Sequence, residues 1–201
     1  MSSWRDRINQ FTGKTRFVVC RIFVHLTGNE VAPILGVFNQ EGQNAIESEG
    51  DLEILGESLV NICQKLLDMK IYWESAANEG DFFWKEEEAG DYFTELSTDS
   101  AQRYLSEPEP DNLTSEENTP LSLPVTRNVV VMITIGFRGE SSDLETNLAD
   151  REALEYGLKA LINLHYQEAL EAINIDFSPA RLGDELTNEQ VLLNFAELIP
   201  L

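Results

Sequence analysis

The chain contains two nearly continuous apolar runs of strand length, one in each half of the sequence. Residues 17–24 read Phe-Val-Val-Cys-Arg-Ile-Phe-Val, and residues 128–135 read Asn-Val-Val-Val-Met-Ile-Thr-Ile. Both runs are rich in β-branched residues, which favour strands because their stiff side chains pack well on a pleated surface. The second run extends over residues 125–137, and its near-continuous apolar character predicts a central strand covered on both faces.

The apolar positions after these two runs recur in the same order, which suggests an internal repeat. The matched positions are Leu59, Cys63, Leu66 and Leu67 with Leu154, Leu158, Leu161 and Ile162; Ile71 and Trp73 with Ile173 and Ile175; and Phe93, Glu95 and Leu96 with Phe195, Glu197 and Leu198. We therefore predict an α+β fold, in which two pseudo-repeated strand–helix–strand–helix units form one sheet faced by helices. The repeat also predicts pseudo-twofold symmetry, with residues 18–24 and 129–135 as neighbouring central strands.

The remaining elements follow from helical periodicity, capping signals and turn residues. We expect helices over residues 31–46, 52–67 and 147–164, one or two helices over residues 85–105, and a strand over residues 169–177. Thr98 or Asp99 is a candidate N-cap that would restart the third helix, and Thr187 opens a capping box for a last helix. Ile71–Trp73 is expected to be a short strand or a packing corner, and residues 78–81, Asn-Glu-Gly-Asp, are expected to form a loop.

Composition divides the chain into four parts. Residues 1–15 form a basic amphipathic segment, residues 16–105 and 125–201 form the two half-repeats of a single compact domain, and residues 106–124 form a linker. Proline, serine and acidic residues dominate this linker, which is typical of a solvated connection. Contact between the acidic linker and a basic partner is the alternative interpretation.

Acidic side chains outnumber basic ones and give the chain a formal net charge of -22. Such a charge repels phosphate backbones, so general nucleic-acid binding is not expected. The two cysteines are too few for a disulfide scaffold and indicate a reducing compartment. The sequence shows neither an apolar run long enough to span a membrane nor the apolar core of a secretory signal. We therefore expect a cytoplasmic location, or a stromal one in a plastid.

The first residues carry a charge opposite to that of the rest of the chain. Trp4, Ile8 and Phe11 fall at helical spacing, and Arg5 and Arg7 lie elsewhere on the same segment. A short basic amphipathic helix of this kind can lie on an anionic membrane or dock on a partner. The alternative is that its apolar side chains fold back onto the protein's own core. These five residues form one candidate contact surface.

No recognised catalytic, cofactor-binding or metal-binding motif is present in the sequence. His25 and His165 are the only histidines, and a metal site needs several ligands at workable spacing. Cys20 and His25 lie an odd number of positions apart in one expected strand, which puts them on opposite faces and argues against a nucleophile pair. Neither apolar strand is followed by a glycine-rich phosphate loop. We therefore predict no catalytic residue, no cofactor and no metal ligand.

Three consecutive aromatic residues, Phe82, Phe83 and Trp84, form a second candidate contact surface. Consecutive side chains point in different directions, so at least one of the three is expected to face solvent. An exposed aromatic ring beside acidic residues is a common anchor for a partner protein. The alternative is that the rings plug the entrance of the following helix into the core.

The order of short motifs along the chain resembles that of a known family. A leucine-rich helix is followed by Tyr72-Trp73, by Gly-Asp-Phe-Phe at residues 80–83 and by Tyr92-Phe93-Thr94-Glu95-Leu96-Ser97; later come Phe177-Ser178-Pro179 and the ending Leu198-Ile199-Pro200-Leu201. Over most of residues 16–201 this order resembles the domain of unknown function family 1517, which occurs in cyanobacteria and plastids and includes the plant fluctuating-light-acclimation protein. The resemblance implies association with thylakoids and adjustment of photosynthesis to changing light. It supplies no catalytic residue and no cofactor.

Three functional hypotheses remain open from the sequence. The first is a non-enzymatic regulatory or assembly factor that acts by protein–protein contacts near a thylakoid membrane, with the N-terminal segment as a peripheral membrane contact. The second is an acidic chaperone or adaptor for a basic client protein. The third is a small hydrolase with an unrecognised carboxylate site, which requires a cleft with two or more perturbed carboxylates. Binding through an apolar anchor should persist above about 0.3 M salt, whereas charge-driven binding to a client should collapse.

Overall fold

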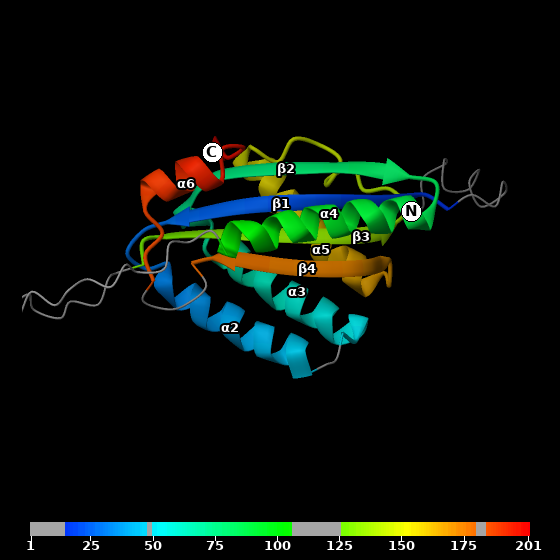
Figure 1. Ribbon diagram of the computed structural model, residues 1–201, viewed down its shortest axis with the longest axis horizontal. Helices are drawn as coiled ribbons and strands as arrows, with labels where there is room; N and C mark the ends of the chain where they lie inside the picture. Colours follow the sequence, from blue (N-terminus) through cyan, green and yellow to red (C-terminus); the bar gives the residue numbers. More distant parts are fainter. Residues whose placement is uncertain (1–14, 48–49, 106–125, 180–183) are drawn as a thin grey trace, which may run out of the picture.

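Five antiparallel strands form one sheet with helices on both faces in the computed structural model, which describes residues 15–47, 50–105, 126–179 and 184–201 (Figure 1). The strands are β1 (Phe17–Thr27), β2 (Trp73–Phe83), β3 (Asn128–Arg138), β4 (Leu170–Ser178) and β5 (Ile199–Pro200). Their order in the sheet is β4-β3-β1-β2-β5. The predicted α+β class is confirmed, and strands alternate with helices along the chain. The pseudo-twofold repeat stays a prediction.

β1 and β3 are neighbours at the centre of the sheet, as the sequence predicts. They pair antiparallel over their whole length, with Ile22 opposite Ile133 and Val24 opposite Val131. Every residue of β3 except Arg138 is buried. A strand covered on both faces needs apolar side chains at nearly every position, which explains why this run does not alternate.

The helices divide unevenly between the two faces of the sheet. α2 (Ala32–Glu47), α3 (Leu52–Asp68) and α5 (Arg151–Tyr166) cover one face, here called the α3 face (Figure 1). α4 (Glu86–Leu105) crosses the opposite face, here called the α4 face, and the short helix α6 (Asn188–Asn194) packs on one end of it. None of the described helices is long and apolar enough to cross a membrane.

The main hydrophobic core lies on the α3 face. The even-numbered residues of β1, from Val18 to Leu26, point into it and share one apolar cluster with Leu59 of α3 and Leu158 of α5. These helix positions belong to the stripes predicted from the sequence. Each fully buried leucine gains about 1.5–3 kcal/mol by leaving water, so this face carries most of the hydrophobic stabilisation.

The α4 face holds two smaller apolar clusters with a polar row between them. One cluster contains Phe23, and the other contains Val19. Between them, the strand register places Arg21 of β1 beside Glu79 of β2 and Thr134 of β3. A charged side chain at this buried position needs polar partners, and α4 supplies several of them.

Of the two alternatives left open over residues 85–105, one helix or two, α4 shows a single helix. The helix runs without a break from Glu86 to Leu105, so neither Thr98 nor Asp99 caps a second helix. The Asp99 carboxylate instead accepts hydrogen bonds from Arg21 and Arg103. Aspartate is a common capping residue, but Asp99 lies inside α4 and makes a tertiary contact with Arg21 of β1.

The predicted loop over residues 78–81 is wrong, because these residues continue β2. The preceding corner is a short 3-10 turn, Lys70–Tyr72, that leads directly into the strand. The capping box is confirmed: the Gln190 N–H donates to the Thr187 hydroxyl, and the Gln190 side chain accepts from the Thr187 N–H. α6 therefore begins where the sequence places the last helix.

Candidate protein-contact site at the edge of β2

The second half of β2 forms an exposed edge of the sheet. β2 pairs with β1 along its length, but on its other side β5 pairs only with Ser75 and Ala76. No strand in the described part of the chain pairs with that side of residues 79–83, here called the open β2 edge, whereas the Asn78 side chain just before it is hydrogen-bonded to Thr146 and Leu148. Residues 79–82 are exposed, Gly80 among them, so the backbone itself reaches solvent. Such an edge is a template for pairing with another chain.

The main-chain polar groups on this edge belong to every second residue. The Leu201 N–H donates to the Glu74 carbonyl oxygen beside β5, and polar groups alternate between the two sides of a strand. Gly80 and Phe82 therefore direct their polar groups away from β1. The Phe82 N–H donates to Oδ1 of Asp81 at 2.7 Å, which is a local substitute for a strand partner.

Gly80 lets β2 approach β1 closely. A Cβ atom at Gly80 would lie 2.7 Å from the Cβ of Cys20 and 2.6 Å from the carbonyl oxygen of Val19. Both distances are far inside van der Waals contact, so a side chain fits here only if the strands move apart. The missing side chain also leaves the backbone of the edge uncovered.

Two of the three candidate aromatic residues are exposed beside this edge. Phe82 and Trp84 are each 47% exposed, and their rings meet edge to face with 6.1 Å between centroids. The Arg16 guanidinium carbon lies 4.6 Å from the centroid of the Phe82 ring, a cation–π contact that helps to hold the ring in place. Phe83 points away and packs against Tyr92 of α4, with 5.4 Å between ring centroids. A contact function for the Phe82–Trp84 pair stays a prediction.

A cleft of about 430 Å³ lies beside the edge on the α3 face. Its buried lining includes Val18 and Cys20, and its exposed lining includes Phe82 and Glu145. Arg16 donates hydrogen bonds to both carboxylate oxygens of Glu145, and these bonds lower the pKa of Glu145. Burial and then the charge of Glu145 raise the pKa of the Cys20 thiol to about 12, so the thiol stays neutral. The α3-face cleft therefore presents a concave surface and the Arg16–Glu145 ion pair, and its Cys20 thiol is not ionised.

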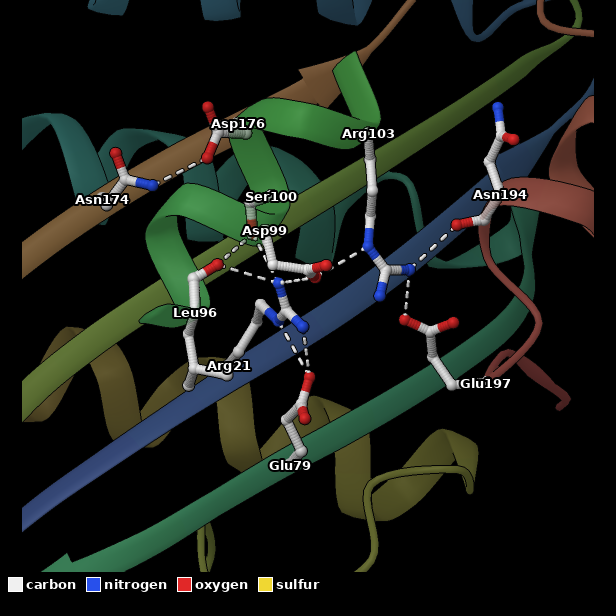
Figure 2. Close-up of polar contacts among 10 residues, drawn as sticks. All are labelled: Arg21, Glu79, Leu96, Asp99, Ser100, Arg103, Asn174, Asp176, Asn194 and Glu197. Atoms are coloured by element: carbon white, nitrogen blue, oxygen red, sulfur yellow. Dashed lines mark hydrogen bonds and ion pairs between the residues drawn. The ribbon is translucent and has the colours of Figure 1, made fainter. Parts of the chain in front are cut away.

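A second cleft, of about 460 Å³, lies on the α4 face of the same strand and shares Asn78 and Glu79 with the first. Figure 2 shows an ionic network along this second cleft. The network links β1 and β2 to α4 and to the segment after α6. Opposite charges alternate along this network, in the order Glu79, Arg21, Asp99, Arg103 and Glu197. The α4-face cleft is therefore lined by paired charges.

Arg21 anchors α4 to the sheet. Its side chain donates to Glu79, to the Leu96 carbonyl oxygen and to Asp99, at 2.9, 2.9 and 2.7 Å. Burial alone would raise the pKa of Asp99, but hydrogen bonds from Arg21 and Arg103 outweigh it and lower that pKa. Because these bonds tie β1, which carries Arg21, to both β2 and α4, the role of the guanidinium is structural.

His25 belongs to a separate buried polar group on the α4 face. Its Nδ1 lies 2.9 Å from Ser75 Oγ, and its Nε2 lies 3.2 Å from Asn128 Oδ1. Burial is the main cause that lowers the pKa of His25, so the ring is neutral at pH 7. All three residues are at most 7% exposed, which gives a substrate no access to the serine. The group satisfies buried polar atoms, in keeping with a structural role for His25.

The hydrolase hypothesis requires a cleft with two or more perturbed carboxylates, and it stays a prediction. The described residues contain no cluster of three or more His, Cys, Asp or Glu side chains that could hold a metal ion. Burial raises the pKa of Asp176, whose carboxylate accepts a 2.7 Å hydrogen bond from Asn174. Asp176 lines neither of the two clefts described above, whereas acid–base catalysis by a carboxylate pair needs both groups beside one substrate.

The N-terminal candidate surface lies outside the described residues. Trp4, Arg5, Arg7, Ile8 and Phe11 all precede residue 15, and the acidic linker over residues 106–124 is outside as well. Their contact functions stay predictions.

The sequence reasoning missed the acidic residues that accompany the aromatic pair. Asn-Glu-Gly-Asp favours turns, so the local sequence around Glu79 and Asp81 predicts a loop. A weak signal was present, since these acids alternate with Gly80 and Phe82 in the period of two that a strand requires.

Comparison with known proteins supports the resemblance found in the sequence. The sequence profile of the family described as "Protein of unknown function (DUF1517)" matches residues 16–201. No curated protein and no solved structure matches the chain. The match spans all the strands and helices described above.

Proposed function

The chain belongs to the DUF1517 family of proteins of unknown function, and on that premise we propose that it is a non-enzymatic regulatory or assembly factor that acts by protein–protein contacts near a photosynthetic membrane. The exposed Phe82–Trp84 pair beside the open β2 edge supports the contact function. The family resemblance alone supports the location near a photosynthetic membrane.

The aromatic pair has the physical properties of an interface anchor. Large aromatic side chains dominate binding energy at protein interfaces, where they bury much area at the cost of few rotatable bonds. β2 fixes the backbone of Phe82, and Arg16 and Trp84 both contact its ring. Because the rings are already held in place, a partner loses little binding energy in ordering them.

Affinity capture with matched variants tests this function. Tagged full-length protein is incubated with membrane and soluble fractions of a photosynthetic host, and bound proteins are identified by mass spectrometry. Wild type is compared with the double variant Phe82→Ser/Trp84→Ser. The control is Tyr166→Ser, which removes an aromatic ring that is 71% exposed on another part of the surface.

We expect subunits of photosystem, antenna or electron-transfer complexes with wild type and with the control, and about tenfold less of them with the double variant. Circular dichroism and urea unfolding establish that the double variant is folded. Equal capture by all three proteins would contradict the contact site. A wild-type capture without photosynthetic subunits would contradict the proposed location.

A further inference from the structure

We propose that the open β2 edge binds an extended, basic segment of a partner protein as an added strand. The inference rests on the proposed contact function and deepens it by naming the chemistry of the partner. It commits the site to backbone pairing along residues 79–83, with side-chain contacts on both faces of the sheet.

The backbone of the edge is prepared for such pairing. β5 already occupies this side of β2 at Ser75 and Ala76, and an added strand would continue the line of β5. Gly80 is exposed, and each edge-facing residue offers one N–H donor and one carbonyl acceptor. The Phe82 N–H donates to the neighbouring Asp81 side chain, and a partner carbonyl can replace that bond.

The two clefts provide places for the side chains of the added strand. Successive side chains of a strand point to opposite faces of the sheet. The α3-face and α4-face clefts flank the same stretch of β2, since Asn78 and Glu79 line both. Successive side chains of the partner would therefore enter opposite clefts, and the Phe82–Trp84 pair would contact an apolar side chain at one end.

Charge selects a basic partner. Glu79, Asp81 and Glu95 are exposed on the α4-face side of the edge, where Glu79 is ion-paired with Arg21, and the exposed Glu145 on the α3-face side is ion-paired with Arg16. The pKa of Tyr92 is raised, mainly by burial of Tyr92 and then by the nearby charges of Glu79, Asp81 and Glu95. Lysine or arginine side chains at every second position of an added strand share one face, so on the α4 face they would meet Glu79, Asp81 and Glu95.

A second copy of this chain is a poor occupant of the same edge. Pairing of β2 with β2 would bring Glu79 and Asp81 of one copy close to the same acids of the other. Like charges placed opposite each other on paired strands are destabilising, and charged edge residues are a common defence against self-association.

β4 forms the opposite edge of the sheet and is less suited to strand addition. Its residues 172–177 are only partly exposed, whereas residues 79–82 of β2 are exposed. α3 and α4 also both contact β4, one from each face. The accessible edge backbone is therefore on β2.

Defined peptides test the proposal on the full-length protein. The probe is a fluorescent nine-residue peptide of alternating lysine and valine. Its comparisons are a glutamate–valine peptide and a lysine–valine peptide methylated at every backbone nitrogen, which keeps the charge but loses the strand donors. We expect anisotropy to show binding of the first peptide only, with affinity about tenfold weaker at 0.3 M than at 0.05 M salt. Binding of the methylated peptide with unchanged affinity would overturn strand addition.

Two variants with the same change in net charge localise the binding. Asp81→Lys places a cation on the edge, and Glu57→Lys places one on the exposed side of α3, far along the sheet from β2. We expect Asp81→Lys to weaken peptide binding at least about tenfold and Glu57→Lys to leave it nearly unchanged. Equal losses would show that only net charge matters and would overturn the proposal.

Amide hydrogen exchange identifies the occupied backbone. With the lysine–valine peptide bound, the amides of Gly80 and Phe82 should exchange at least about tenfold more slowly. Protection on β4 instead, or no protection, would overturn the proposal. Protection without peptide that vanishes when residues 1–13 are deleted would assign the edge to the chain's own basic segment, and protection that rises with protein concentration would assign it to a second copy.

Failure of this inference differs from failure of the proposed function. If photosynthetic partners depend on Phe82 and Trp84 but the Gly80 amide is not protected by the peptide, strand addition is wrong and the contact function stands. If the peptide protects Gly80 but no photosynthetic partner is captured, the edge chemistry stands and the proposed location is wrong.

Discussion

Gly80 lies where β1 and β2 come so close that no side chain has room between them. Its absent Cβ would lie within 2.7 Å of atoms of Val19 and Cys20, in a part of the sheet where both neighbours are buried. The same residue exposes the edge backbone, so one glycine serves both strand packing and access to the edge.

Replacement of Gly80 by alanine should lower the free energy of unfolding by about 1–3 kcal/mol, because the added methyl group forces the strands apart. Gly90→Ala is the matched control, since Gly90 lies inside α4 with no atom within 4 Å of its Cβ position. That control should raise the free energy by about 0.5–1 kcal/mol. Urea unfolding measures both, and equal effects of the two substitutions would contradict the close approach at Gly80.

Asp176 should make stability depend on pH in a defined direction. Burial raises its pKa in the folded state above the unfolded value of about 3.9. The native protein therefore holds the proton more tightly, and stability falls as pH rises from about 3.9 through the folded pKa. Above that window, the buried charge destabilises the fold.

The substitution Asp176→Asn removes this charge and should raise the free energy of unfolding at pH 7. The gain should shrink as pH falls through the folded pKa and vanish near pH 3.9. Asp143→Asn, at an exposed carboxylate, is the control and should change stability by no more than about 0.5 kcal/mol. A gain for Asp176→Asn that stays constant from pH 7 to pH 4 would contradict the raised pKa.

The burial and direction of a side chain could be predicted only where the helix or strand that carries it was predicted correctly. The burial of Cys20 and Cys63 follows from their places in apolar patterns, and both thiols are buried. The directions of Phe82, Phe83 and Trp84 could not be assigned, since the strand that sets their phase was expected to end before them. The ion pairs of Arg21 join residues far apart in the chain, which no local pattern encodes.

At the scale of elements, Arg103 links α4 to the end of α6. Its guanidinium donates to the Asn194 carbonyl oxygen at 2.9 Å and to Glu197 at 2.5 Å. α6 has only seven residues, and a helix that short depends on tertiary contacts for its stability.

Arg103→Gln should therefore loosen α6 while the central strands stay protected. We expect amide exchange in α6 to accelerate about tenfold, with little change in β1 and β3. Lys85→Gln, which breaks an exposed ion pair with Glu88 at the start of α4, serves as the control and should leave α6 unchanged. Unaltered exchange in α6 of the Arg103 variant would show that other contacts hold this helix.

The elements predicted best are those with the strongest periodicity. The two central strands and the leucine stripes of α3 and α5 are repetitive patterns that burial on the sheet enforces. The second half of β2 escaped prediction because Asn-Glu-Gly-Asp is typical of turns. An edge strand tolerates such residues, since only one of its sides pairs with a neighbour and its side chains reach water. The short strand β5 has no local signal, because pairing at Ser75 and Ala76 defines it.

At the scale of the whole molecule, the net charge of -22 should oppose folding by self-repulsion. Salt screens this repulsion, with a Debye length of about 10 Å at 0.1 M. The melting temperature should therefore rise by a few degrees as sodium chloride increases from 0.05 to 0.5 M. The same rise is expected with choline chloride if screening is the cause, and a falling melting temperature in both salts would contradict dominant self-repulsion.

Site-specific photo-crosslinking in a photosynthetic host tests the central claim most directly. A photoreactive phenylalanine analogue replaces Phe82 in the full-length protein, and the same analogue replaces Tyr166 as the control. After irradiation, position 82 should give discrete adducts with subunits of a photosynthetic complex, and position 166 should not. The absence of adducts at position 82, or the same adducts from both positions, would contradict a protein-contact function at the edge of β2.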